Sequence, residues 1–324
     1  MKGDKKGFLM SDVTIKVILI MLGLTVILFL IWQINWKGTI DRETCHQSVI
    51  FKATVPEDTI IHTGQKIVDL PLRCETEKIC ISKNSLLAGN CGDELGSNFK
   101  TERVSGTKEQ KEQQIKEIIA NSIYDCWSVM GEGKLQIFSR GVDSFSDSKT
   151  GVICARIAFD EDLKKEIENV DGMNEYLIKT KVPYSDLTYH QYLTNSRQSP
   201  AYTPDMKAND KFNTQGQKAV IYLEVGNSAL PDLMSVWGSV AAAASAGAII
   251  GSVVPIPLVG TAAGAVGGAA AGAVIGYVSG GVVKEEVDKF LNENKASTYG
   301  VYLFIEYNKE TINDLEVKDF ENFA

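Results

Sequence analysis

The chain of 324 residues carries 33 Lys plus Arg and 41 Asp plus Glu, a formal net charge of -8. That length is enough for one large domain or two modest ones, each able to bury a core of its own. The basic residues are scattered, whereas phosphate binding needs a basic face or groove. We therefore expect no nucleic-acid partner, and attachment to a membrane has to come from apolar sequence rather than from basic charge.

The first strongly apolar stretch lies near the N-terminus, where the sixteen residues from Val17 to Trp32 carry no charge. A helix of about 20 residues over this stretch and its margins covers roughly the 30 Å of a hydrocarbon core. Tryptophans at its outer end suit the membrane interface. The sequence therefore predicts a transmembrane anchor over residues 13–36, with these candidate anchor residues: Val17, Leu22, Phe29, Trp32 and Trp36.

The charges beside this stretch indicate its orientation. Lys2, Lys5 and Lys6 precede it, which favours a cytoplasmic tail over residues 1–12. A removable signal peptide is the alternative, but its apolar part would be shorter and an A-x-A-like cleavage site should follow, where this chain reads IWQINWKGTIDRETC. We expect a cell-membrane protein with an extracytoplasmic ectodomain and the lipid bilayer as a partner. No Asn begins an N-x-S/T sequon, which disfavours a glycosylated eukaryotic surface protein and is compatible with a prokaryotic one.

All six cysteines follow the predicted anchor: Cys45, Cys74, Cys80, Cys91, Cys126 and Cys154. An even number of cysteines outside the cytoplasm indicates disulfides. A metal site is the alternative, but the chain has no C-x-x-C pair and only three histidines. We expect no metal, no cofactor and one specific pairing, Cys126 with Cys154, because the first falls in a predicted helix and the second in a predicted strand; the other pairings stay open.

The ectodomain pattern over residues 37–230 and 285–324 predicts an α+β fold. Thr107 and Gln110 form a capping box that opens the clearest helix, whose apolar stripe is Ile115, Ile118, Ile119, Ile123, Cys126, Trp127 and Met130. The segments read as strands are SVIFKATV at 48–55, parts of 66–81, KLQIF at 134–138 and GVICARIAF at 151–159. We expect a stapled loop over 84–106, an acidic helix from 160 to about 170, and a polar loop over 195–217.

Four tyrosines precede that polar loop: Tyr176, Tyr184, Tyr189 and Tyr192. They could line a binding groove, but no charged or metal-binding constellation accompanies them. We expect them to pack the domain surface.

Two strong strand patterns, Lys218–Val225 and Thr298–Tyr307, bracket the most unusual part of the chain. If these strands are neighbours, everything between them is an insertion at one edge or end of the ectodomain. That insertion, residues 231–284, contains 51 consecutive uncharged residues from Leu233 to Val283, which ordinary soluble domains do not have.

The insertion carries a repeat of small residues and a central pair of prolines. Pro255 and Pro257 predict a hairpin turn between two helices. The candidate helix-packing glycines, most of them four residues apart, are Gly247, Gly251, Gly260, Gly264, Gly268, Gly272, Gly276 and Gly280. Residues four apart share one face of a helix, so a glycine ridge lets another backbone approach closely. The segment resembles the glycine-zipper hairpins of membrane-inserting toxins and bacteriocins. The resemblance implies close helix packing, either between copies of this chain in a homo-oligomer or against a membrane helix of a partner.

Catalytic motifs give no case for an enzyme. The chain has no G-x-S-x-G and no H-E-x-x-H, and GEGK at 131–134 is only a fragment of a phosphate loop. Two functions stay open. In the first, the hairpin inserts or oligomerises in a membrane and gives a pore, a breach or a fusion-like contact. In the second, a permanent transmembrane hairpin holds a structural or interaction ectodomain at the surface.

Overall fold

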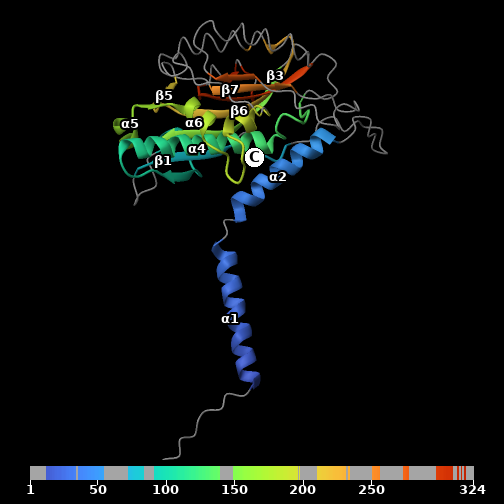
Figure 1. Cartoon of the computed structure of the whole chain (residues 1–324), viewed down its shortest axis with the longest axis vertical. Helices are drawn as coiled ribbons and strands as arrows, with labels where there is room; N and C mark the ends of the chain where they lie inside the picture. Colours follow the sequence, from blue (N-terminus) through green and yellow to red (C-terminus); the bar gives the residue numbers. More distant parts are fainter. Residues whose placement is uncertain are drawn as a thin grey trace, which may run out of the picture. The chain divides into compact units, whose positions relative to one another are not determined.

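The computed structural model describes residues 12–33, 36–54, 72–83, 91–138, 149–195, 197, 210–230, 233, 250–255, 273–276, 297–308, 312–313, 315 and 317–318. The chain divides into two units, Met1–Glu43 and Thr44–Ala324. The first contains helix α1 (Asp12–Gln33) and the start of α2 (Trp36–Thr54). The second contains the remaining helices and all the described strands (Figure 1).

Helix α1 covers most of the predicted anchor. Its described side chains run from Lys16 to Val26, and all of them are exposed, Val17 and Leu22 among them. Phe29 and Trp32 lie in α1 and Trp36 begins α2, but their side chains are outside the described residues. Within the part of the chain that is described, no helix combines the length and the apolar character needed to cross a membrane.

An eight-stranded mixed sheet forms the centre of Thr44–Ala324, in the order β2-β1-β3-β6-β9-β7-β8, with β10 also beside β3 (Figure 1). β1, β2, β3 and β10 are mutually parallel where they pair, and β6 runs antiparallel to both of its neighbours. The central strands are long and buried on both faces, as their nearly continuous apolar sequences require. Their bounds are β1 Glu77–Ser82, β2 Lys100–Arg103, β3 Lys149–Phe159, β6 Lys218–Gly226, β9 Thr298–Glu306 and β10 Val317–Lys318.

The expected adjacency of β6 and β9 is confirmed. The two strands pair along their whole length, from Lys218 opposite Glu306 to Gly226 opposite Thr298. The chain between them therefore leaves β6 and enters β9 at the same end of this pair of strands. Residues 227–297 form one excursion from the central pair of strands.

Apart from the helical Leu233, the described parts of the insertion are strands, where the glycine spacing predicts helices. β7 (Ile250–Pro255) pairs antiparallel with β9, and β8 (Ala273–Gly276) pairs antiparallel with β7. Gly251 and Gly276 therefore lie in strands, and Pro255 ends β7 opposite Tyr299 instead of turning a helical hairpin. The helical prediction is wrong for these residues, because Ile and Val favour strands and β9 offers the backbone partners that an isolated segment lacks.

One face of the sheet packs against helices. α4 (Lys108–Val129) contacts β3, β6 and β9 and lies along this face (Figure 1). Its capping box is confirmed: Thr107 accepts from the Gln110 amide and Gln110 bonds back to the Thr107 amide. The expected stripe is confirmed too, since Ile115, Ile119, Ile123 and Trp127 are fully buried in the core that includes Tyr222 and Phe304.

Smaller elements complete this layer. The helices are α3 Gly92–Leu95, α5 Glu161–Glu166, α6 Met173–Lys179 and α7 Tyr189–Leu193, and the strands β4 Asn169–Asp171 and β5 Lys211–Asn213 form a separate pair. The other sheet face buries Ile221, Leu223 and Leu303 in a second cluster, with Leu230 and Leu233 among the residues against it.

Five local predictions are wrong in whole or in part. The helix expected from 160 to about 170 ends at Glu166 and is followed by strand β4, and the expected loop 195–217 contains strand β5. Residues 48–54 belong to helix α2 and not to a strand, because Cys45, Val49 and Ala53 recur every four residues and bury one helical side. KLQIF at 134–138 is irregular with bends and not a strand, and the expected loop 84–106 contains α3 and β2.

Candidate functional site

Three disulfides lie within the unit Thr44–Ala324. Cys126–Cys154 joins α4 to β3 as predicted, and the other two pairs are Cys45–Cys74 and Cys80–Cys91. Among the described residues no cysteine is free. Three disulfides in one domain are typical of an oxidising compartment outside the cytoplasm.

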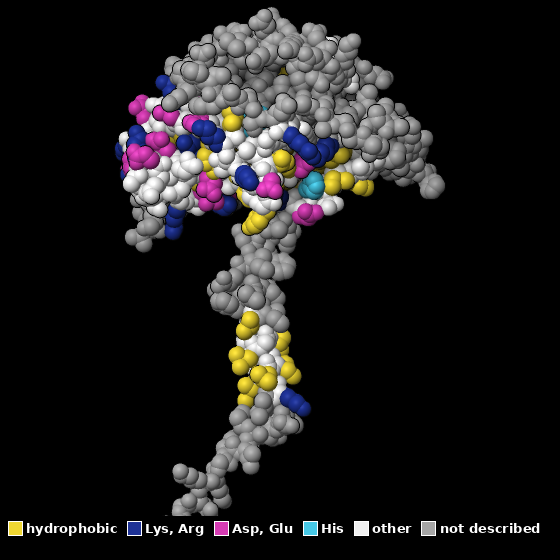
Figure 2. Space-filling model, in the orientation of Figure 1, with side chains coloured by type: hydrophobic (Ala, Val, Ile, Leu, Met, Phe, Trp, Pro, Cys, Tyr) yellow, Lys and Arg dark blue, Asp and Glu magenta, His cyan; other side chains and the backbone are white. Residues whose placement is uncertain are grey.

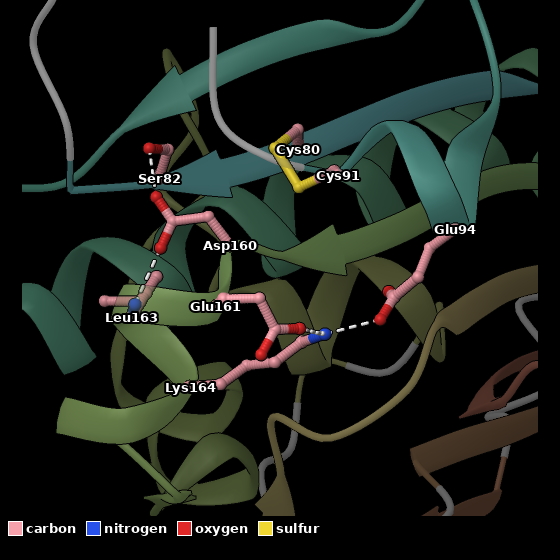
Figure 3. The surroundings of a disulfide bond; sticks show 8 residues. All are labelled: Cys80, Ser82, Cys91, Glu94, Asp160, Glu161, Leu163 and Lys164. Atoms are coloured by element: carbon pink, nitrogen blue, oxygen red, sulfur yellow. Dashed lines mark hydrogen bonds and ion pairs between the residues drawn. A yellow bond between two sulfur atoms is a disulfide. The ribbon is translucent and has the colours of Figure 1, made fainter. Parts of the chain in front are cut away.

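Polar side chains gather at the carboxyl ends of the parallel strands β1 and β3 (Figure 3). The hydroxyl of Ser82, at the end of β1, donates to Asp160 Oδ2, and Asp160 Oδ1 accepts from the Leu163 amide at 2.6 Å. Asp160 follows β3 and is the N-cap of α5, so its buried carboxylate starts this helix. Both of its oxygens are bound within the protein, and this pair therefore fixes the β3–α5 connection.

Lys164 lies between two glutamates beside the Cys80–Cys91 disulfide (Figure 3). Its ammonium group bonds to Glu94 on α3 and to Glu161 Oε1 at 2.9 Å. Burial lowers the pKa of Lys164, but the two hydrogen-bonded carboxylates raise it more, so the net shift is upward. The charge is thus kept, and it ties α5 to α3.

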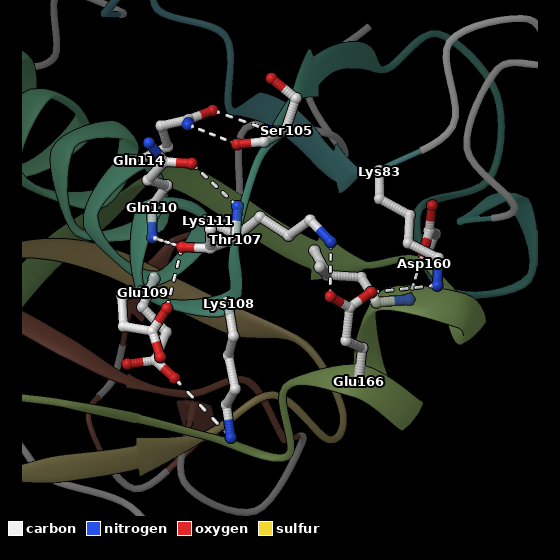
Figure 4. Close-up of polar contacts among 12 residues, drawn as sticks. Lys83, Ser105, Thr107, Lys108, Glu109, Gln110, Lys111, Gln114, Asp160 and Glu166 are labelled. Atoms are coloured by element: carbon white, nitrogen blue, oxygen red, sulfur yellow. Dashed lines mark hydrogen bonds and ion pairs between the residues drawn. The ribbon is translucent and has the colours of Figure 1, made fainter.

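A second ion network ties α4 to α5 (Figure 4). Lys83 Nζ lies 3.1 Å from Glu166 Oε2, and Lys111 donates to the other oxygen of Glu166. Hydrogen bonds from Lys111 and Lys83 hold the pKa of Glu166 below its usual value. Ion pairs this exposed contribute little to stability. On the face in Figure 2, acidic and basic side chains of the described part are interspersed in the same way.

Two basic residues are buried at the same end of the sheet. Arg156 on β3 donates to Gln217 Oε1 and to the Glu94 carbonyl, and its guanidinium lies 4.3 Å from the Tyr307 ring centroid. Lys218, at the start of β6, donates to Asn213 Oδ1 at 2.8 Å and to the Gln215 carbonyl at 3.0 Å. Burial lowers the pKa of Lys218, opposed by Glu306 and Glu94. Arg156 and Lys218 thus both donate hydrogen bonds to residues of the turn that precedes β6.

The turn after α4 has a left-handed backbone at three successive residues. Gly131, Glu132 and Gly133 have φ of 79°, 57° and 66°. Glu132 is the residue that this conformation disfavours; its carboxylate accepts from Tyr192 Oη at 2.6 Å and from Lys134. Nearby, His46 donates from Nδ1 to the Val129 carbonyl at 2.9 Å. GEGK is therefore a helix-terminating turn, with the Lys134 ammonium on Glu132.

Glu224 on β6 is the deepest carboxylate of the described chain, with no exposed surface. Oε1 accepts from the Ile137 amide at 2.5 Å and Oε2 from the Phe138 amide at 3.0 Å. This contact fastens the segment after the left-handed turn to the centre of the sheet. Tyr222, two residues earlier on the same strand face, packs against Trp127 at 5.9 Å between ring centroids.

His190 on α7 is 5% exposed, and neither ring nitrogen has a hydrogen-bond partner among the described residues. Burial lowers its pKa from 6.5 to about 4. As the pH falls, His190 therefore binds a proton in the unfolded chain before it does so in the folded chain. The stability that neutral His190 gives above pH 6.5 is lost progressively toward pH 4.

We expect the free energy of unfolding to fall by about 3 kcal/mol between pH 7 and pH 4 through this group, at 1.36 kcal/mol per pKa unit. Urea unfolding at several pH values measures it. His190→Leu, which leaves no hydrogen-bond partner orphaned, should flatten that part of the curve. An identical pH dependence in both proteins would assign the effect to other groups.

The sequence-predicted site residues are only partly brought together. The six cysteines pair, and Gly251 and Gly276 lie in β7 and β8, which pair with each other. Gly247, Gly260, Gly264, Gly268, Gly272, Gly280 and Pro257 lie outside the described residues. Of the four tyrosines, Tyr176 and Tyr189 are buried, Tyr192 is partly buried and Tyr184 is fully exposed.

Sequence reasoning missed the buried polar groups. Arg156 and Glu224 each interrupt an apolar strand pattern, GVICARIAF and KAVIYLEV, and that interruption is the available signal. Comparison with protein-family models, with curated proteins and with solved structures finds no match.

Proposed function

We propose that this chain is a membrane-anchored extracytoplasmic protein that stores an uncharged, glycine-rich segment, residues 233–283, at the edge of its sheet for use in a membrane. We propose α1 as the anchor although its described side chains alone do not make a membrane-spanning segment, because the uncharged run of the sequence continues from Val17 to Trp32. The segment is proposed to insert and to oligomerise, giving a pore, a breach or a fusion-like contact.

The observation that carries this proposal is the pairing of β6 with β9. Gly226, the last residue of β6, pairs with Thr298, the first residue of β9. The segment between them can therefore move away while β6 and β9 stay paired. Of the described pairings, only that of β7 with β9 joins the segment to the rest of the sheet. The disulfides, all outside residues 227–297, would hold the remaining domain in place.

The stored form and the membrane form must differ in backbone structure. In hydrocarbon every backbone group needs an internal partner, so an open pair of strands such as β7 and β8 cannot stay there. Helices satisfy this requirement, and the glycines at four-residue spacing would then form a packing ridge. We infer a strand-to-helix change on entry into the bilayer.

A fragment that starts at Lys37 tests storage and activity together. We expect it to be monodisperse without detergent and to release dye from liposomes. The alternative function, a permanent transmembrane hairpin that holds the ectodomain at the surface, requires detergent for the same fragment. Aggregation without detergent would therefore favour the alternative.

Replacing Gly268 and Gly272 by Leu tests the ridge. The change adds apolar surface but places side chains where a second backbone would pack, so we expect crosslinked oligomers and dye release to fall about tenfold or more. Ile275→Leu, which leaves the glycine spacing intact, should behave like the native chain. Equal or greater assembly in the double variant would show that apolar transfer alone drives association.

A further inference from the structure

The loop between α6 and α7 holds one tyrosine ring entirely in solvent. Tyr184 is 109% exposed relative to the reference residue, and among the described side chains of Thr44–Ala324 only Phe51 and Leu187 are other large apolar groups that are exposed. A fully exposed ring gains nothing from burial in the folded chain. Its presence is therefore not explained by stability of the fold.

The backbone under this ring is strained. Tyr184 has φ of 60°, which bulky residues adopt rarely. The Ser185 amide donates to the Val182 carbonyl at 3.2 Å, with Pro183 and Tyr184 between them, which is the arrangement of a type II turn. Glycine is the residue this position favours, so the tyrosine is held here against its backbone preference.

The loop is also rigidly supported. The Val182 amide donates to the Leu187 carbonyl at 3.0 Å, and a β-bridge joins Lys181 to Thr188. The Leu187 amide donates to Ser185 Oγ at 3.1 Å. Below the tip, Val182 and Tyr189 are buried in the main core. The backbone that carries the ring is thus held in advance, so binding through the ring would order little more than its own side chain.

We propose that the 181–188 loop is a protein-docking site in which Tyr184 inserts into an apolar pocket of a partner protein. Tyrosine is enriched among the residues that dominate interface energies, where its ring is buried and its hydroxyl stays hydrogen-bonded. Lys181 and Asp186, paired at 3.0 Å, supply a polar rim beside it. This site does not depend on the membrane activity proposed for residues 233–283.

The charges favour a protein over a lipid surface as the occupant. Asp186 is fully exposed two residues from the ring, and a carboxylate there opposes contact with anionic lipid or entry into hydrocarbon. Membrane-surface binding also needs a wider apolar face than one ring and the partly exposed Leu187.

Photocrosslinking in the native cells tests the site. Benzoylphenylalanine at position 187 of the full chain is expected to give one discrete adduct with a different polypeptide. The adduct should persist in Tyr184→Phe and fall by about tenfold or more in Tyr184→Gly and Tyr184→Asn, both of which accept the left-handed backbone. Thermal unfolding of both variants should occur at the native temperature or higher.

Four results would overturn the proposal: no adduct, an adduct with lipid, an adduct with a second copy of the chain, or an adduct of equal yield in the Gly and Asn variants. Loss of the adduct accompanied by a lower unfolding temperature in both variants would equally reject it, because Tyr184 would then have a structural role.

Discussion

Glu224→Gln is expected to lower the free energy of unfolding by about 3 kcal/mol. The native carboxylate accepts from the amides of Ile137 and Phe138 in a site with no exposure. A glutamine offers one acceptor oxygen and turns an NH₂ group toward the second amide. A buried donor without a partner costs about 1–3 kcal/mol, and the lost charge weakens the remaining bond.

Urea unfolding of the fragment that starts at Lys37 measures this effect. Glu161→Gln is the matched control, since Glu161 is a 59% exposed carboxylate paired with Lys164 and should change stability by less than about 1 kcal/mol. Similar small losses in both variants would mean that residues 137–138 are held by other contacts.

Removal of the Cys126–Cys154 disulfide, by replacing both residues with Ala, should lower stability by about 3 kcal/mol or more. The bond closes a separation of 28 residues, and such a loop restricts the unfolded chain by about that amount. Cys126 is buried against the core as well, so its removal also leaves a small cavity.

The Cys45–Cys74 pair offers a control of nearly equal loop length, with a separation of 29 residues. If loop entropy alone acted, the two double variants would lose equal stability. We expect the larger loss for Cys126–Cys154, which joins α4 to a central strand. A loss below about 1 kcal/mol for both pairs would contradict a structural role for the disulfides.

Much of the fold of Thr44–Ala324 could be predicted because its signals are local. The capping box at Thr107 and Gln110 fixes the start of α4, and the helical stripe places Cys126 in the core opposite Cys154. The apolar sequences of β6 and β9 identify central strands, whose pairing is confirmed. Residues 48–54 mislead because their β-branched composition suggests a strand, while the four-residue recurrence of Cys45, Val49 and Ala53 places them in a helix.

The glycine-rich segment shows why spacing alone does not decide structure. Four is an even number, so residues four apart share a face of a strand as well as a face of a helix. Ile250, Val253 and Val254 favour the strand, and β9 provides its partner only in the folded chain. Tertiary pairing of this kind leaves no local signal, and neither does the burial of His190; for Glu224 the signal is its interruption of the apolar pattern of β6.

Lipid-phase photolabelling of the full chain in liposomes tests the central claim most directly. A carbene reagent confined to the bilayer should modify residues 17–32 of α1 and residues 233–283. β6 and β9 should stay unmodified, because their pairing survives departure of the segment. Labelling of α1 without residues 233–283 would contradict the membrane use of that segment, and labelling of neither would contradict the anchor as well.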